Sequence, residues 1–248
     1  MIFIVFLYGI VFGSFLNVCI YRIPNEESIV RGRSHCPKCN HKLSWIDLIP
    51  IVSFLTLKGK CRYCKAKVSP RYPLIESFTG ILVVLIYIRY GITFEFFKYF
   101  TLTLFLIVIA FIDYDTTDVY TSVIYTGIGF GMLFIILGKV MYSYTILNYL
   151  IAVLIGLGVI GGICLFTGGM GTGDIEIAVL CGIYLGWKLE IAFILFSFII
   201  GGIFAVTLII TKKKKKTDYI PLGPSLALGA YLVIIIGENL ITRLSGLG

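Results

Sequence analysis

The stretch Met170-Gly171-Thr172-Gly173-Asp174 lies between two long apolar runs and places an acidic side chain at their junction. A charge at membrane depth is costly, and an ionisable residue found there is by default a functional one. Glycines surround this acid, and they allow the backbone to leave helical geometry and to approach another segment closely. They are Gly168, Gly169, Gly171 and Gly173. We therefore predict that Asp174 is one half of a catalytic pair.

The composition of the chain indicates a membrane protein. Of its 248 residues, 58% are hydrophobic and only 14% are charged, whereas soluble domains usually carry roughly 25% charged residues. Eight segments approach the ~20 apolar residues that a helix needs to cross the hydrocarbon core, and the sixth is the shortest. They are Ile2–Ile20, Leu74–Tyr90, Phe94–Ile112, Val119–Leu137, Ile146–Thr167, Ile175–Trp187, Leu189–Thr211 and Leu222–Ile241. We predict an all-α polytopic membrane protein of about eight transmembrane helices.

The predicted spans divide the chain into three parts. Residues 1–21 have no basic segment before them and a strongly basic one after them, so they are predicted to be the first transmembrane helix and not a cleaved signal peptide. Residues 22–73 are the only piece long enough to form a small soluble domain. Residues 74–248 contain the remaining spans, and we predict that they form a multi-helix membrane domain.

The positive charges fix the expected orientation. The formal net charge is +8, and of the 21 Lys and Arg residues 11 lie in Arg22–Pro73 and five in Lys212–Lys216. The positive-inside rule places both segments in the cytoplasm, where such basic runs also attract anionic lipid. This placement argues against a nucleic-acid partner. With eight spans, the links that contain Asp113 and Asp174 also face the cytoplasm.

Four cysteines in the 22–73 segment predict a metal site. Cys36 and Cys39 form one CxxC pair, Cys61 and Cys64 form another, and 21 residues separate the pairs. Tetrahedral zinc takes four thiolates, and a segment of roughly 50 residues rarely folds without a metal or a disulfide. Two disulfides or a redox pair are alternatives, but a reducing cytoplasmic face disfavours structural disulfides. His35 and His41 flank the first pair, and either could replace one of the ligands.

Acidic residues also end the third span, at Asp113, Asp115 and Asp118. If Asp113 and Asp174 face each other, they cannot both ionise easily, so one keeps a proton and the other stays charged. The charged carboxylate can then take a proton from water while the protonated one polarises a peptide carbonyl. That is the arrangement of an aspartic protease. Both histidines lie beside the cysteine pairs, so no histidine chemistry competes within the spans.

Several motifs together resemble one family. Gly171-Thr172-Gly173-Asp174 resembles the GxGD motif of intramembrane aspartyl proteases, and Gly13–Pro24 resembles the GSFLNVxIYRxP signature of bacterial type IV prepilin peptidases. The paired CxxC motifs, Arg71–Glu76 and Ile112–Asp115 follow in the family's order, so the resemblance covers nearly the whole chain. One departure is Val119-Tyr120-Thr121, where family members usually carry Pro-Asp or Pro-Asn.

The resemblance implies a bifunctional enzyme of the bacterial cytoplasmic membrane. Such an enzyme cleaves the basic leader of type IV prepilins, or of pilin-like subunits of type II secretion, at the cytoplasmic face. It then methylates the new N-terminus with S-adenosylmethionine. Carried over residue by residue, the resemblance makes Asp113 and Asp174 the catalytic pair, supported by the Gly171 and Gly173 loop. The zinc ligands are Cys36, Cys39, Cys61 and Cys64.

Two further sets of candidate residues are expected to contact the methyl donor and the basic leader. The methyl donor has no Gly-rich nucleotide fingerprint to bind it, so its candidate contacts come from the first-span signature and the large loop. These are Asn17, Arg22, Arg71 and Glu76. Because the substrate leader is expected to be basic, the acids Asp115, Asp118 and Glu176 are candidates for recognising it. The sequence sets neither the oligomeric state nor the particular pilin substrate.

Two rival functions remain open at this point. Paired intramembrane acids beside a glycine-broken helix are also typical of a cation-coupled transporter. The two cysteine pairs and the position of the acids on one membrane face argue against it. The second rival is a prepilin peptidase without methyltransferase activity.

Overall fold

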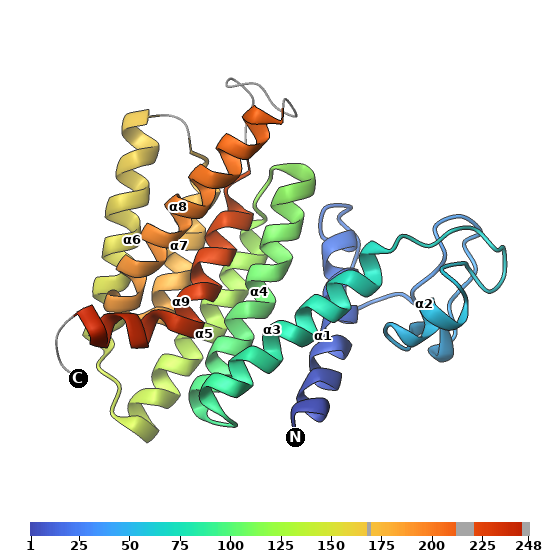
Figure 1. The fold of residues 1–248 in the computed structure, drawn as a ribbon, viewed down its shortest axis with the longest axis horizontal. Coiled ribbons are helices and arrows are strands. Elements are labelled where there is room, and N and C mark those ends of the chain that lie inside the picture. The colour runs from blue at the N-terminus through green and yellow to red at the C-terminus, as the bar shows by residue number, and fades with distance from the viewer. Residues whose placement is uncertain (168–169, 212–220, 245–248) are drawn as a thin grey trace. The chain divides into compact units, whose positions relative to one another are not determined.

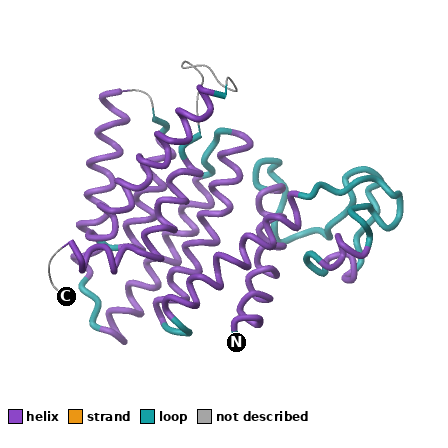
Figure 2. Tube along the Cα trace, in the orientation of Figure 1, coloured by secondary structure: helices purple, strands orange, loops and turns teal. Residues whose placement is uncertain are grey.

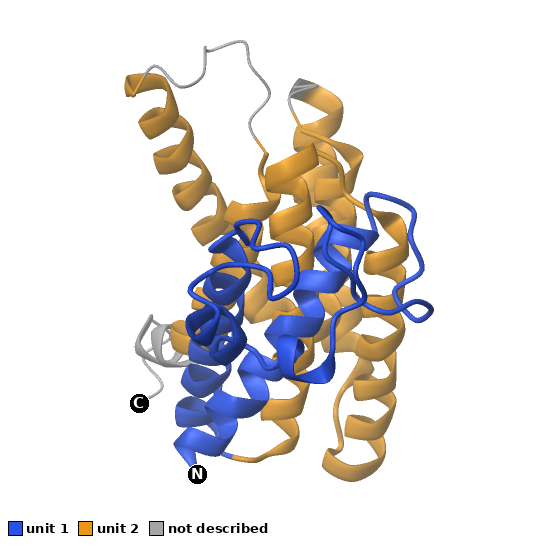
Figure 3. Cartoon of the chain, turned by 90° about the vertical axis from the view of Figure 1, so that its right-hand side faces the viewer, with its two compact units in different colours: residues 1–91 blue, residues 92–248 orange. Residues whose placement is uncertain are grey.

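The computed structural model describes residues 1–167, 170–211 and 221–244 (Figure 1). Gly168, Gly169 and the basic run Lys212–Lys216 therefore lie outside the described residues. The chain separates into two compact units, residues 1–91 and 92–248 (Figure 3). Within the described ranges the regular structure is helical (Figure 2). Pairing of extended backbone in those ranges is limited to two isolated bridges.

Unit 1 is built on two long helices joined by an extended loop segment. These elements are α1 (Ile2–Arg22), the 3-10 helix η1 (Trp45–Leu48), α2 (Val52–Thr56) and α3 (Arg71–Tyr90). Helices α1 and α3 pack closely through glycines, because a Cβ on Gly9 would lie only 2.7 Å from Cα of Gly80. Gly13 makes the same kind of approach to Glu76, at 2.8 Å. Small residues spaced four apart allow this approach in lipid.

The ends of α3 follow from local sequence. The helix begins three residues before the predicted span, and Pro73 lies in its first turn, where a missing N–H costs no helical hydrogen bond. It ends at Gly91, which has φ +63° and so adopts a backbone conformation that favours glycine.

Unit 2 is a bundle of long helices. Its elements are α4 (Phe94–Thr116), α5 (Thr121–Tyr142), α6 (Ile146–Thr167), α7 (Thr172–Leu185), α8 (Trp187–Ile210) and α9 (Gly223–Leu244). Thr93 caps the start of α4 by accepting a hydrogen bond from the Phe96 N–H. Thr117, in the left-handed region, ends α4. Gly186, with φ +78°, forms the sharp corner between α7 and α8.

The short helix α7 lies at the centre of unit 2. It packs against α4, α5, α6, α8 and α9, and Ile177, Leu180 and Tyr184 have no exposed surface. The Tyr184 hydroxyl donates to the Gly127 carbonyl of α5 at 2.9 Å. A 14-residue helix spans about 21 Å, less than the roughly 30 Å of hydrocarbon. Because other helices enclose it, α7 does not need to cross the membrane alone.

The structure confirms the predicted class, a helical multi-pass membrane protein. Among the described residues, six helices are long and apolar enough to cross a membrane, namely α1, α3, α4, α5, α6 and α8. The remaining two predicted segments form α7, which is as short as the sequence indicated, and α9, whose apolar part is Gly223–Gly237.

Candidate active site and metal centre

Asp113 lies on the last turn of α4 and is buried, with 2% of its surface exposed. Its Oδ2 accepts a hydrogen bond of 2.7 Å from the main-chain N–H of Gly223, at the start of α9. The sequence placed Asp113 just after a span, whereas in the structure it still belongs to the helix. Its side chain therefore points into the bundle from a rigid element.

Asp174 lies in the first turn of α7 and is equally buried, at 3%. Its Oδ2 accepts a hydrogen bond of 3.1 Å from the Gly171 N–H, and its own N–H donates to the Gly171 carbonyl. This reciprocal pairing satisfies groups that a helix start leaves without partners. Asp113 is close enough to Asp174 to act on it electrostatically. The structure thus brings together two buried carboxyl groups from different helices.

Gly173 makes the close approach to another segment that the sequence suggested, but the partner, Val119, could not be predicted. A Cβ at this position would lie 2.6 Å from Cβ of Val119, a residue in the connection between α4 and α5. Real Cβ atoms do not approach so closely, so a side chain here would push the two segments apart. Thr172, Gly173 and Asp174 are all helical, so the glycine serves close approach rather than an unusual backbone conformation.

The three acids predicted to recognise a basic leader lie near this pair along the chain. Asp115 and Asp118 are exposed, and Glu176 is half-buried on α7. Asp118 also acts electrostatically on Asp113. The end of α4 and the start of α7 therefore carry several acids whose side chains differ in exposure.

In unit 1, the four cysteines of the two CxxC pairs converge. Their sulfur atoms all lie within 4.8 Å of one another, and Cys36 Sγ is 3.9 Å from Cys64 Sγ. Cys36 and Cys61 are buried, whereas Cys39 and Cys64 are exposed. All four are free thiols, so the alternative of two disulfides does not describe this structure. Neither histidine joins the group, and the ring of His41 instead lies 3.6 Å from that of Tyr63.

Two short hairpins of the same design hold these cysteines. In the first, the Cys36 N–H donates to the His41 carbonyl at 3.0 Å, and the residue after the second cysteine, Asn40, has φ +55°. In the second, the Cys61 N–H donates to the Ala66 carbonyl at 2.8 Å, and Lys65 has φ +60°. Each hairpin presents two sulfurs to a common point.

The geometry suits a metal ion. Zn–S bonds of about 2.3 Å in a tetrahedron place the sulfurs about 3.8 Å apart, which matches the observed 3.9 Å. Burial alone would raise the pKa of the Cys36 thiol, but hydrogen bonds from the backbone of Cys39 and Lys38 lower it to about 7. Cys36 therefore readily yields the thiolate that binds metal, whereas the pKa of its neighbour Cys39 is raised to about 11, so a bound metal ion would have to displace that proton. The cysteine cluster can therefore hold a metal ion.

Asp47 ties η1 to the second hairpin. Its carboxylate forms an ion pair of 2.6 Å with Arg62 and accepts hydrogen bonds from the Ser44 hydroxyl and from Tyr63. Burial favours a higher pKa for Asp47, but the hydrogen bonds from Arg62 and Ser44 lower it to about 2. Asp47 is therefore ionised at neutral pH, and the loop carries a fixed negative group beside the cysteines.

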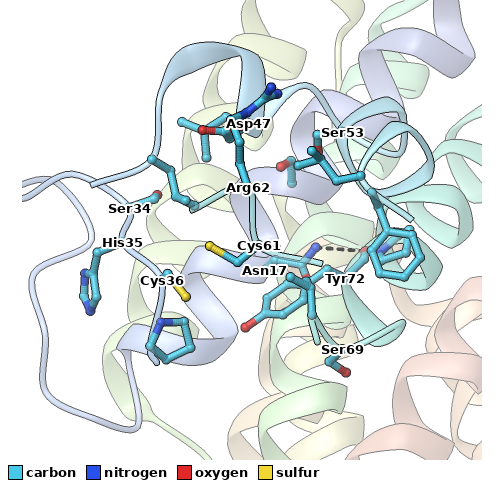
Figure 4. A pocket seen from close by; sticks show the side chains of 18 of the residues that line it. Asn17, Ser34, His35, Cys36, Asp47, Ser53, Cys61, Arg62, Ser69 and Tyr72 are labelled. Atoms are coloured by element: carbon cyan, nitrogen blue, oxygen red, sulfur yellow. Dashed lines mark hydrogen bonds and ion pairs between the residues drawn. The ribbon is translucent and has the colours of Figure 1, made fainter. Parts of the chain in front are cut away.

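A cavity of about 410 Å³ lies in unit 1 between α1, the start of α3 and the cysteine hairpins. Figure 4 shows the sulfur atoms of Cys36 and Cys61 in its wall, together with Asn17 and Tyr72. Small-molecule sites usually measure roughly 300–1,000 Å³. The cavity is therefore large enough for a cofactor.

Three of the four residues predicted to contact a methyl donor line this cavity, and Arg71 is not in its wall. The Asn17 amide donates to the Tyr72 carbonyl at 3.1 Å. Arg22 donates to the Ser28 carbonyl at 2.9 Å, and Glu76 accepts from the Ile51 N–H at 2.7 Å. Asn17, Arg22 and Glu76 are all buried, with 7% of their surface exposed. Side chains of both charges thus lie in the wall, each anchored by backbone.

Local sequence does not predict the role of some residues in these sites. The donor to Asp113, Gly223, lies between Pro221 and Pro224, a pattern that by itself indicates only a helix break. A glycine flanked by prolines at a helix start was the available signal, but the sequence does not show which side chain meets it. Val119 and Gly9 act only through contacts with distant segments, so local sequence contained no signal for them.

Comparison with known proteins agrees with the division of the chain. Residues 7–90 match the Bacterial Peptidase A24 N-terminal domain, and residues 100–206 match the Type IV leader peptidase family. These ranges fall within units 1 and 2 respectively. A buried acid pair in a helical membrane bundle, in a chain that matches peptidase domains, defines the class as a membrane peptidase.

Relatives along the full length make the assignment specific. The prepilin leader peptidase/N-methyltransferase of Bacillus subtilis (strain 168) is 32% identical over 98% of this chain and 97% of its own length. The protein of that name from Aeromonas salmonicida (strain A449) is 31% identical over 97% and 92%. The one from Neisseria gonorrhoeae is 31% identical over 93% and 89%. No solved structure matches significantly. The chain belongs to the prepilin leader peptidase/N-methyltransferase family.

Proposed function

We propose that this protein is a membrane aspartic endopeptidase that removes the leader peptide of type IV prepilins or pilin-like proteins. It acts at the cytoplasmic face of the bacterial cytoplasmic membrane and then methylates the new N-terminus. The observation that carries the peptidase proposal is the pair of buried carboxyl groups, Asp113 and Asp174, which interact across two helix ends. The relatives named above support the choice of substrate class.

Cleavage requires one ionised and one protonated carboxyl group. The ionised aspartate takes a proton from water as the water oxygen bonds to the carbon of the scissile peptide, and the protonated aspartate gives its proton to the carbonyl oxygen. The C–N bond then breaks as the first aspartate passes its proton to the leaving amine. The second aspartate recovers its proton from the diol intermediate, so the pair returns to its starting state.

The basic leader would meet a region rich in acid. Asp115 and Asp118 are exposed next to the end of α4, and Glu176 lies one turn or less from Asp174. Opposite charges steer association and fix register more than they add affinity. We expect Asp115→Lys to raise KM for a prepilin with a basic leader while leaving kcat nearly unchanged. An unaltered KM in charge-reversed variants of all three acids would contradict this role.

The second activity belongs to the cavity of unit 1. S-adenosylmethionine, when bound, would supply the methyl group. Arg22 would pair with its carboxylate, while Glu76 would face its positive charge, and Asn17 would offer its amide from α1. These are buried groups of the right signs in a cavity of about 410 Å³. Zinc on the four cysteines would fix the two hairpins that form part of the same wall.

The orientation of the chain follows from its charge distribution. The loop of unit 1 holds 11 of the 21 basic residues, so it should remain in the cytoplasm. An enzyme with that loop in the cytoplasm meets prepilin leaders and soluble methyl donor on the same side.

The test uses the full chain purified in detergent with a prepilin that carries its leader. Asp113→Ala and Asp174→Ala should each abolish cleavage while the protein still elutes as a folded species. Asp115→Ala is the matched comparison, because it removes an exposed aspartate two residues from Asp113 and should retain kcat, with at most a higher KM for the prepilin. If Asp113→Ala cleaves normally and Asp115→Ala does not, the assigned pair is wrong.

A further inference from the structure

The carboxylate of Asp113 has a donor that comes from a segment 110 residues away. Its Oδ2 accepts the main-chain N–H of Gly223 at 2.7 Å, and this hydrogen bond is buried. Gly223 is the first residue of α9. The first N–H groups of a helix have no partner within the helix, so this one is available to a side chain. The next residue, Pro224, has no N–H that might compete for it.

Only glycine fits at this position. A Cβ on residue 223 would lie 2.6 Å from Oδ2 of Asp113 and 3.0 Å from its Cγ. Any larger residue forces the Asp113 side chain or the start of α9 to shift, but every residue except proline keeps the main-chain N–H that donates to Asp113. Because Gly223 has no side chain, the Asp113 carboxylate can reach its main-chain N–H.

Small residues hold α9 in the place that this contact needs. On α8, Ser197 and Gly201 are one turn apart, and they face Ser225 and Gly229 on α9. A Cβ at Gly229 would lie 2.8 Å from the Ser197 main-chain nitrogen, so the two backbones nearly touch. Ser197 and Ser225 are each 2% exposed. This seam fixes the first turn of α9 against the bundle.

The contact between Gly223 and Asp113 also changes the electrostatic surroundings of the Asp113 carboxyl group. Asp113 lies at the C-terminal end of α4, where the helix dipole disfavours a negative group, while the start of α9 offers the favourable end. Asp118, in the connection to α5, acts electrostatically on Asp113, and Asp113 in turn acts on Asp174 of α7. Glu176 is the other acid of α7. Helix α5 holds one charged residue, Lys139 near its far end, and the described side chains of α9 include none.

We propose that the Gly223 N–H is the positioning group that keeps Asp113 ionised and aimed, so that Asp113 is the base toward water and Asp174 carries the shared proton. This inference rests on the proposed peptidase function and goes beyond it by dividing the two roles. Gly223 does not itself touch the substrate. It acts through Asp113, and its loss would affect the chemical step rather than substrate binding.

The test compares two substitutions at one position. Gly223→Ala adds a Cβ and keeps the N–H, whereas Gly223→Pro adds a Cβ in the same place and puts a ring carbon on the nitrogen where the donated hydrogen was. Proline is tolerated at the first position of a helix, so the second variant retains a plausible helix start. Gly237→Ala is the control on the same helix, because it is also crowded, with Leu189 Cδ2 at 2.9 Å, but lies about 21 Å further along α9.

We expect the proline variant to have a kcat about tenfold to hundredfold below that of the alanine variant, the cost of one hydrogen bond to a charged group. KM for prepilin should stay equal in the two. The acid limb of the pH–rate profile should move to higher pH in Gly223→Pro, because the ionised form of Asp113 has lost its donor. Gly237→Ala should keep the profile of the parent.

Two results would overturn the inference. One is equal kcat and an equal acid limb in the alanine and proline variants while Asp113→Asn remains inactive. The other is the same shift of the profile in Gly237→Ala, which would show a general response of α9. Normal cleavage by Asp113→Asn would instead defeat the proposed function itself, so the two failures are distinguishable. Circular dichroism and elution volume in detergent show whether each variant is folded.

Discussion

Unit 1 builds its cysteine cluster from two copies of one short hairpin, whereas unit 2 builds its acidic site from the ends of helices that are far apart in the chain. Each hairpin closes within a few residues, between Cys36 and His41 and again between Cys61 and Ala66. The acidic site instead needs Asp113 on α4, Asp174 on α7 and Gly223 on α9. The cysteine site is therefore formed mostly by local backbone, whereas the acidic site depends on how the helices pack.

The difference also separates the chemistry. The cysteine cluster and the charged cavity belong to unit 1, while the acid pair belongs to unit 2. If methylation and cleavage follow this division, then a change in one unit should affect mainly one activity. Substitutions in one unit should therefore show whether the two activities are independent.

The largest effect should come from removing one carboxyl group of the acid pair. Asp113→Asn and Asp174→Asn should each lower kcat/KM for leader cleavage by about 10³-fold or more, because an amide neither takes nor gives the required proton. Quantitative gel analysis of prepilin processing gives the rates. Glu26→Gln, an exposed acid outside both sites, should cleave like the parent. A loss below tenfold in either aspartate variant would contradict the pairing.

The next largest effect should follow loss of the metal. Cys36→Ser should reduce bound zinc from about one ion per chain to near zero, since a structural tetrahedral site needs four ligands. Without the metal the two hairpins lose their common anchor, so methylation of pre-cleaved pilin should fall at least about tenfold. Leader cleavage, which belongs to the other unit, should fall less. Elemental analysis measures the bound zinc, and mass spectrometry measures methylation. Cys164→Ser, a half-exposed thiol of α6, should change neither. Zinc retained in Cys36→Ser would refute the ligand set.

The metal site of unit 1 can be predicted from the sequence more fully than the acidic site of unit 2, because its residues lie close together in the chain. The CxxC spacing predicts a metal site directly, because both ligands of a pair lie on one turn. The apolar runs predict the helices to within a few residues, since hydrocarbon thickness sets their length. By contrast, no local pattern shows that Gly173 meets Val119 or that Gly223 meets Asp113. Those contacts depend on how whole helices pack.

A smaller effect should come from crowding the approach of Gly173. Gly173→Ala would place a methyl group 2.6 Å from Cβ of Val119, and we expect cleavage to fall about tenfold, since small misplacements of catalytic groups are costly. Combining it with Val119→Gly removes the opposing carbon and should recover part of the activity. Methylation of pre-cleaved pilin should stay unchanged in both. Full cleavage by Gly173→Ala alone would show that this contact does not position Asp174.

The smallest effect should come from Glu76→Gln in the cavity. The amide still accepts the Ile51 N–H, which it meets at 2.7 Å, but it no longer offers a negative charge to the methyl donor. KM for S-adenosylmethionine should rise about threefold to tenfold, the value of one polar interaction, with cleavage unaltered. Isotope-labelled methyl transfer at several donor concentrations measures it. An unchanged KM would place the donor elsewhere.

The most direct test of the separation is to give the Asp113→Asn protein two substrates in parallel, intact prepilin and pilin whose leader has already been removed. Mass spectrometry of both, with S-adenosylmethionine present, reports cleavage and methylation on the same molecules. Two sites predict that prepilin stays uncut and that the pre-cleaved pilin gains its methyl group at the parental rate. Cleavage of prepilin, or failure to methylate the pre-cleaved pilin by a folded protein, would contradict the division of the two activities between two sites.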